Sequence, residues 1–147
     1  MRKRGIITYI AVCVVGLLPG CRAAKEFPYD YRGDQFHFGQ GGGFTGAVNA
    51  FVLLDDGRLF QKGKTDTSMT YVSTWKRDFT RQMFSNYTSL GLERLNHQHP
   101  GNLYYFIEFH SPDKKPHLIS WGQEGYTPSE GIVSFYQILY KSTRSKS

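Results

Sequence analysis

FTGAVNAFVLLDDG, residues 44–57, decides the fold of this chain. Apolar side chains occupy both alternating faces from Phe44 to Leu54, which predicts a central strand that is covered on both sides. Asp55-Asp56-Gly57 follows at once and predicts a tight hairpin, because Asp56-Gly57 tolerates the two positive φ angles of a type I′ turn. Residues 58–62 then return as the partner strand. The stretch therefore indicates an antiparallel sheet.

Three further segments have strand character. Phe36 and Phe38 alternate with His37 in a short strand over residues 35–39. Aromatic and β-branched residues predict two more strands, which are separated by a polar loop at 111–116. Residues 63–70 are polar and are expected to form a mobile loop. The predicted sheet has about five strands, mostly antiparallel, at 35–39, 44–54, 58–62, 103–110 and 117–121.

A helical period begins after the third strand. Apolar residues recur there every four positions, which predicts a helix capped by Ser73, running to about Leu90 and stopped at Gly91; they are Trp75, Phe79, Met83 and Tyr87.

A second helix is predicted near the C-terminus. Thr127, Pro128 and Glu130 make a capping box with proline at the first helical position. The order is then βββαββα, an α+β fold with both helices on one face of the sheet. We assign residues 35–141 to a single domain and residues 142–147 to a frayed tail.

The beginning of the chain has the layout of a secretory signal peptide. Three basic residues precede an apolar run from Gly5 to Leu18. The junction Leu18-Pro19-Gly20-Cys21 resembles the lipobox of bacterial lipoproteins, in which the cysteine is lipidated and the chain is cut before it. The resemblance implies a signal peptide at 1–20 and a lipidated Cys21 with a tether at 21–34.

Two other interpretations apply to this region. A transmembrane helix needs ~20 apolar residues, which the run before the Pro-Gly break does not reach. An ordinary cleaved signal would leave Cys21 as a free thiol. In enterobacterial lipoproteins, an aspartate directly after the lipidated cysteine resembles an inner-membrane retention signal. This chain has Arg22 at that position, so an outer-membrane location is favoured. Lys25-Glu26 resembles the surface-export signal of Bacteroidota lipoproteins, and the face of the membrane stays open.

Charge and cysteine content argue against a nucleic-acid-binding protein and against a disulfide-stabilised domain. The formal charge is +6, and it falls by three when Arg2, Lys3 and Arg4 leave with the signal. Because no run of five like charges exists, nucleic-acid binding is not expected. Cys13 also leaves with the signal and Cys21 carries the lipid, so the mature chain has no disulfide.

The glycine-rich stretch is the candidate binding loop, comprising Gly41, Gly42, Gly43, Phe44, Thr45 and Gly46. It matches the kinase pattern G-x-G-x-x-G-x-V, yet no Ala-x-Lys, His-Arg-Asp or Asp-Phe-Gly follows, and the dinucleotide pattern would need a helix after the glycines. The run therefore predicts either a turn that requires positive φ or close backbone approach, chiefly at Gly43 and Gly46, or a binding loop with Gly42 at its tip.

Longer motifs in this region resemble known families. The string FGQGGGFTG at 38–46, with Pro100-Gly101-Asn102 and Trp121-Gly122, is similar to small lipoproteins of Bacteroidota. That resemblance covers residues 36–140 and implies fold and location only. The shorter Gly-Gly-Phe-x-Gly at 42–46 resembles small protein inhibitors of thermolysin-type metalloproteases.

The sequence gives little support for catalysis. His97 and His99 would need a further ligand for a metal, such as Glu108, His110 or His117, and the simpler interpretation is a pair of solvated loop histidines. No serine or threonine lies in a nucleophile motif.

We expect no metal, no cofactor and no catalytic residue. The predicted function is a lipid-anchored, non-catalytic binding module of the cell envelope, held in the membrane through Cys21. Its partner would be an envelope protein or a small ligand. The alternatives are a protease inhibitor that uses the glycine loop and an envelope hydrolase.

Overall fold

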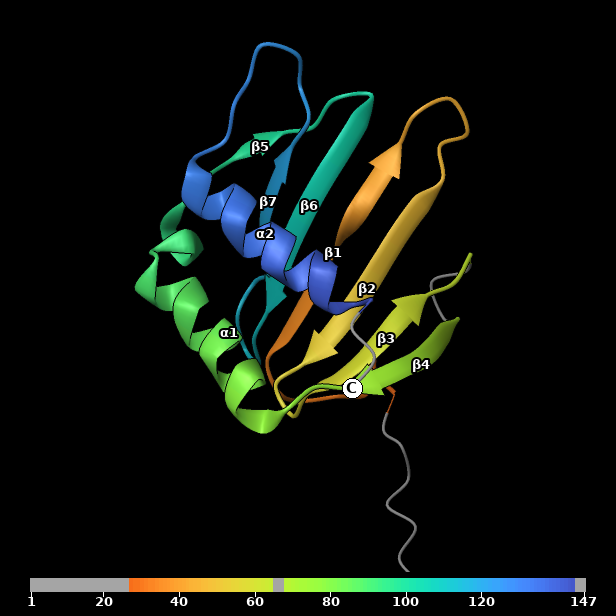
Figure 1. Cartoon of the computed structure of the whole chain (residues 1–147), viewed down its shortest axis with the longest axis vertical. Coiled ribbons are helices and arrows are strands. Elements are labelled where there is room, and N and C mark those ends of the chain that lie inside the picture. Colours follow the sequence, from red (N-terminus) through yellow and green to blue (C-terminus); the bar gives the residue numbers. More distant parts are fainter. Residues whose placement is uncertain (1–26, 65–67, 145–147) are drawn as a thin grey trace, which may run out of the picture.

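A computed structural model describes residues 27–64 and 68–144. These residues form an α+β fold, in which a layer of helices packs on one seven-stranded sheet. The strand order of the sheet is β4-β3-β2-β1-β6-β7-β5 (Figure 1). Every neighbouring pair is antiparallel except β5 with β7. The strands are β1 (Gln35–Gly42), β2 (Val48–Leu54), β3 (Arg58–Lys62), β4 (Met69–Thr74), β5 (Gln98–His99), β6 (Leu103–His110) and β7 (His117–Trp121). The helices are α1 (Arg77–Ser89) and α2 (Glu130–Ser142), with a 3-10 turn η1 (Leu92–Arg94) after α1.

The predicted α+β class and mostly antiparallel sheet are confirmed, and both helices cover the same face of the sheet (Figure 1). The predicted five strands and their βββαββα order are wrong, because the sheet also contains β4 and β5. β4 occupies part of the region that was expected to be a polar loop. It is an edge strand whose side chains are largely exposed, so no alternation of burial marks it in the sequence. β5 is too short to give a periodic signal.

Both helices begin later than predicted. Ser73 belongs to β4, and α1 starts after Lys76, which caps it without a side-chain hydrogen bond. α2 starts after Ser129, so the capping box at Thr127 does not form. The predicted stop at Gly91 is confirmed: this residue has φ 68°, the left-handed conformation that ends helices and that glycine adopts without strain.

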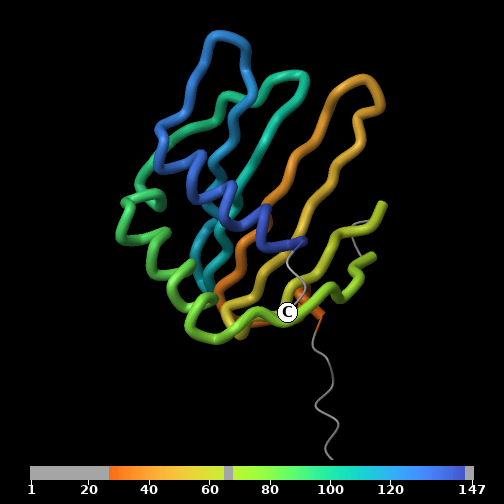
Figure 2. The backbone as a smooth tube through the Cα atoms, in the orientation of Figure 1, coloured from red at the N-terminus to blue at the C-terminus, as the bar shows by residue number. Residues whose placement is uncertain are grey.

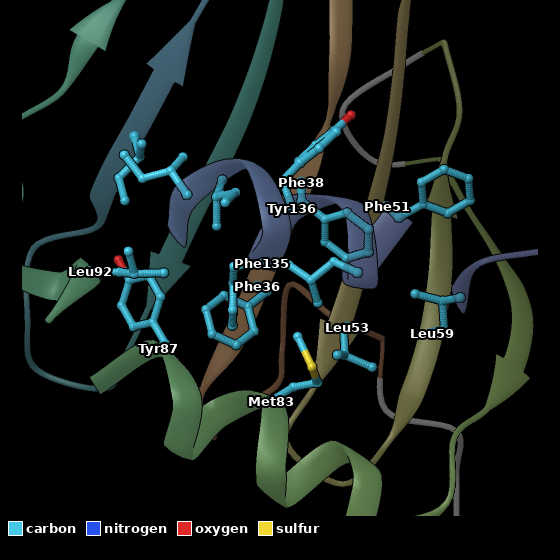
Figure 3. Packing of buried hydrophobic residues seen from close by; sticks show 14 of the residues in the cluster. Phe36, Phe38, Phe51, Leu53, Leu59, Met83, Tyr87, Leu92, Phe135 and Tyr136 are labelled. Carbon is cyan, nitrogen blue, oxygen red and sulfur yellow. The ribbon is translucent and has the colours of Figure 1, made fainter. Parts of the chain in front are cut away.

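Phe36 lies at the centre of the main core, where the two helices meet the sheet (Figure 3). Its ring contacts rings from both helices and from β6, with centroid distances of 4.5 Å to Phe84, 5.1 Å to Tyr87 and Phe109, and 5.6 Å to Phe135. The predicted apolar face of α1 is present, since Met83 and Tyr87 are buried. Aromatic packing therefore joins α1, α2, β1 and β6 in one cluster.

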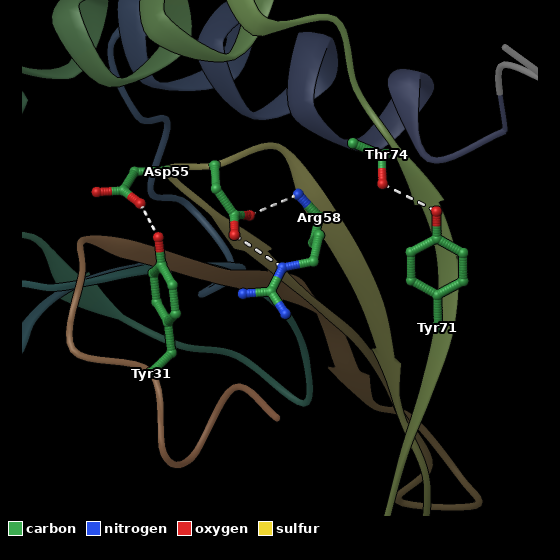
Figure 4. Close-up of polar contacts among 6 residues, drawn as sticks. Tyr31, Asp55, Arg58, Tyr71 and Thr74 are labelled. Carbon is green, nitrogen blue, oxygen red and sulfur yellow. Dashed lines mark hydrogen bonds and ion pairs between the residues drawn. The ribbon is translucent and has the colours of Figure 1, made fainter. Parts of the chain in front are cut away.

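A second, smaller core lies on the opposite face of the sheet, which we call the helix-free face. It consists of Val52, Leu54 and Phe60, with Tyr31 packed against them. The Tyr31 hydroxyl donates a hydrogen bond to Asp55 of the β2–β3 turn (Figure 4). Residues 27–34, which were assigned to the tether, thus reach the sheet and cover part of this face. β2 is covered on both sides over residues 50–54, as its sequence predicts. The predicted start of this strand at Phe44 is wrong, because residues 44–47 lie in the exposed hairpin loop.

The β2–β3 turn is held by its own side chains. Arg58 donates from Nε to Asp56 Oδ2 at 2.7 Å and from its backbone N–H to Asp56 Oδ1 at 3.0 Å (Figure 4). Gly57 has the predicted positive φ, 96°, but Asp56 does not, because Asp113 is the only non-glycine residue with positive φ in the described ranges. The predicted type I′ turn is therefore wrong, although the hairpin forms, with the Gly57 N–H donating to the Leu54 carbonyl at 2.9 Å. The Arg58 guanidinium also lies over the Tyr31 ring, 5.4 Å from its centroid, which adds a cation–π contact between the turn and the N-terminal segment.

Phe36→Ala tests the position of the main core. We expect a loss of about 3–5 kcal/mol in the free energy of unfolding, because the substitution leaves a cavity among four aromatic rings. Phe44→Ala is the matched control, since the Phe44 side chain is fully exposed and makes no core contact. Urea melts of both variants measure the difference. Equal stability of Phe36→Ala and the parent would contradict the packing.

Candidate functional site

The helix-free face is open beyond the part that residues 27–34 cover. A shallow apolar groove of about 440 Å³ lies there, across β2, β1, β6 and β7. We call it the apolar groove; its lining consists of Val48, Pro100, Tyr104, Phe106, Leu118 and Ser120. Ligand pockets are typically concave and mostly apolar, so this groove is a candidate binding surface.

Gly41 forms the floor of the groove between Val48 and Tyr104. It is opposite both residues in the sheet register. A Cβ on Gly41 would lie 2.6 Å from the Tyr104 hydroxyl oxygen and 3.1 Å from Val48 Cγ2. The absence of a side chain therefore lets the tyrosine ring lie flat across the strand.

The rest of the glycine loop forms the exposed tip of the β1–β2 hairpin. Gly43 donates its N–H to the Asn102 carbonyl at 2.8 Å, and Gly46 donates to the Gly43 carbonyl at 3.1 Å. Phe44 between them is fully exposed, and Thr45 and Gly46 are exposed as well. The loop thus holds an aromatic side chain in solvent on a hydrogen-bonded frame.

The predicted roles of the glycines need correction. Gly43 and Gly46 have the expected positive φ, 74° and 61°, but a Cβ at either position meets open space. Gly42, predicted to be the free tip, has φ 90°, and a Cβ there would lie 1.9 Å from the Asn102 carbonyl oxygen. The close backbone approach is therefore at Gly42, because the neighbouring turn at 100–102 packs against it.

A polar cluster adjoins the groove on the same face, formed by His37, Glu108 and His110. His37 is paired with Glu108 across β1 and β6, and His110 lies two residues further along β6, so all three side chains project from one face. The two imidazole rings stack with centroids 4.1 Å apart and planes 18° apart. His110 Nε2 lies 3.1 Å from Glu108 Oε2. We call these three residues the His37 cluster.

Burial and proximity set the charges in the His37 cluster. Desolvation, together with the charge of His110, lowers the pKa of His37 to about 3, so His37 is neutral at pH 7. The His110 imidazole lowers the pKa of Glu108 and keeps it ionised. The cluster therefore offers one carboxylate beside an uncharged imidazole.

The histidines that the sequence singled out lie elsewhere. His97 is bonded through Nδ1 to the Tyr126 hydroxyl, and the His99 ring stacks on Tyr126 with centroids 4.0 Å apart. His117 Nε2 lies 2.8 Å from the Leu95 carbonyl oxygen, and its Nδ1 is bonded to the Tyr87 hydroxyl. These three histidines are half-buried and hydrogen-bonded or stacked, so the prediction of solvated loop histidines at 97 and 99 is wrong.

The sequence does not mark His37 as a ligand, because its proximity to Glu108 depends on the long-range pairing of β1 with β6. The alternation of Phe36 and Phe38 around His37 is a signal in the sequence that places it on the face opposite the core. It does not say which strand lies beside it.

Comparison with known proteins gave no match, either to protein-family models or to the sequences of curated proteins.

Gly42→Ala and Gly43→Ala separate steric contact from backbone strain. Gly42→Ala should cost more than the ~1 kcal/mol expected from positive φ alone, because its Cβ meets the Asn102 carbonyl, whereas Gly43→Ala should cost about that amount. Gly131→Ala is a control of opposite sign: it lies in α2 with open space around it and should stabilise by about 0.5–1 kcal/mol. Urea melts measure the stability of each variant. If Gly43→Ala is less stable than Gly42→Ala, the structure is contradicted.

Acid should destabilise the fold through His37. Between its ordinary pKa of ~6.5 and the value of about 3 in the fold, only the unfolded chain takes up a proton at this residue. Stability is therefore full above pH ~6.5 and falls on acidification by up to about 1.4 kcal/mol per pH unit for this one group. His37→Gln should show a shallower fall between pH 7 and 5 in denaturant melts. The same slope in both proteins would show that His37 is protonated in the fold.

Proposed function

We propose that this chain is a lipid-anchored cell-envelope lipoprotein that binds a partner, without catalysis, through its glycine loop and apolar groove. The observation that carries the proposal is the full exposure of Phe44 on a hydrogen-bonded loop. Burying such a side chain in a partner contributes about 1.5–3 kcal/mol. A rigid loop also loses little conformational entropy on binding.

The position of the loop fits an anchor near the start of the chain. The first described segment, residues 27–34, lies toward one end of the sheet, whereas the β1–β2 hairpin tip projects from the other end together with the turns near residues 100 and 125 (Figure 2). β1 alone separates its two ends by ~23 Å at ~3.3 Å per residue. An anchor at Cys21 would hold the domain close to the membrane and leave the loop free to meet a partner.

The lipid anchor itself rests on the lipobox resemblance, since residues 1–26, Cys21 among them, lie outside the described part of the chain. Within the described ranges, no helix is both long and apolar enough to cross a membrane. We propose the outer membrane as the location, on the basis of Arg22. We propose an envelope protein or a small ligand as the partner.

A protease inhibitor is the second candidate, and a specific observation favours it. An inhibitory loop must stand at the surface on a rigid base, and the Gly-Gly-Phe-x-Gly segment does so at the end of two central strands, β1 and β2. The same geometry serves binding of any other envelope protein. Inhibition of a thermolysin-type protease by the parent but not by Phe44→Ser would favour the inhibitor.

Cys21→Ser tests the anchor. Metabolic labelling with a palmitate analogue should mark the parent protein and leave the serine variant unlabelled, as an uncleaved precursor in the membrane fraction. Gly131→Ala provides a control that keeps Cys21. Label retained on Cys21→Ser would contradict lipidation at this residue.

Crosslinking at position 44 tests whether Phe44 contacts a binding partner. A photo-reactive phenylalanine analogue at position 44 should give a discrete crosslinked product in intact cells, because this ring would lie in the interface. The same analogue at Leu90, which is 55% exposed at the end of α1, is the control and should give none. Equal products from both positions, or none from position 44, would contradict a binding role for the loop.

A further inference from the structure

We propose that the His37 cluster is a binding site for one divalent transition-metal ion of the zinc class. Two imidazoles and one carboxylate are a ligand set that zinc uses in sites where a fourth position stays open to water or to a bound ligand. The proposal stands independently of the lipid anchor and of the glycine loop.

The geometry brings the three ligands together on a rigid base. Each offers a donor atom, and all three donor atoms lie within 4.8 Å of one another. Neighbouring ligands of a tetrahedral zinc with bonds of ~2.0 Å are ~3.3 Å apart, so the side chains would rotate inward by a small amount on binding. The ligands come from β1 and β6, which are paired along their whole lengths in the middle of the sheet.

An unsatisfied nitrogen supports the assignment. His110 Nε2 is buried and lies 3.1 Å from Glu108 Oε2, within ion-pair distance, but has no hydrogen-bond partner among the described residues. Buried polar nitrogens are nearly always satisfied. A cation between His110 and Glu108 would give both atoms a partner.

Gln35 orients one of the ligands. Its Oε1 lies 3.2 Å from His37 Nε2, and its Nε2 donates to the Tyr31 carbonyl at 3.2 Å. In the tautomer in which His37 Nε2–H donates to Gln35, the lone pair is on Nδ1. Metal-binding histidines ordinarily donate their other N–H to such a partner. Gln35 is therefore a positioning residue for His37.

The surroundings affect the strength of binding. The Lys62 charge acts on both His37 and Glu108 and opposes a second cation. The three ligands are half-buried, so water can reach the fourth position. Leu118 of the apolar groove is paired with Glu108 across β6 and β7, which places the open position beside the groove.

Zinc binding by the full-length protein in detergent tests the site directly. Equilibrium dialysis at pH 7, after removal of metal with a chelator, should give one Zn²⁺ per chain at micromolar zinc. Zinc should also raise the melting temperature by mass action. His37→Gln, Glu108→Gln and His110→Gln should each weaken binding by ~100-fold or more, and Gln35→Leu by ~10–100-fold. Lys62→Gln should tighten it.

His97→Gln and His99→Gln are the matched controls, since they remove histidines in or next to β5, outside the His37 cluster. They should bind zinc like the parent. A parent that binds no zinc, or binding that is lost in these controls and kept in the cluster variants, would overturn the proposal.

A second measurement uses only the parent protein and therefore does not depend on whether the variants fold. In the parent protein, bound zinc should protect His37 and His110 from diethylpyrocarbonate but leave the reactivity of His97 and His99 unchanged. Peptide mapping by mass spectrometry gives the result for each residue. Unchanged reactivity of His37 and His110 in saturating zinc would likewise overturn the proposal. Zinc binding that persists in Cys21→Ser would separate this site from the anchor.

Discussion

The pairing of β1 with β6 is the interaction on which the rest of the structure depends. It joins residues 35–42 to residues 103–110 and so connects β2, β3 and β4 to β7 and β5 in one sheet. On one face it places Phe36 against Phe109, beneath both helices. On the other it places His37 beside Glu108. Slipping the register by one residue would exchange the two faces and destroy the core and the cluster together.

Local patterns in the sequence predict the parts of the fold that depend on neighbouring residues. β2, its hairpin and the end of α1 at Gly91 follow from alternation, turn chemistry and the left-handed glycine. The start of α1 does not, because Trp75 continues the four-residue apolar spacing and is buried although it precedes the helix. β4 is not predicted from the sequence for the opposite reason. As an edge strand it buries few side chains, and its Thr-Tyr-Val composition is its only sequence signal.

The candidate sites differ in the same way. Consecutive glycines and an adjacent phenylalanine mark the loop in the sequence, although the contact between Gly42 and Asn102 requires the fold. The His37 cluster requires a pairing across more than sixty residues of intervening chain, and sequence proximity instead draws attention to His97 and His99. Those two residues pack on Tyr126, where hydrogen bonding and stacking account for them.

Cross-strand nuclear Overhauser effects between β1 and β6 test the account most directly, because the core, the groove floor and the His37 cluster all require one register. The account predicts backbone contacts that place Phe36 opposite Phe109, His37 opposite Glu108 and Gly41 opposite Tyr104. A register shifted by one residue would put His37 and Glu108 on opposite faces. That result, or the absence of contacts between the two strands, would contradict the account.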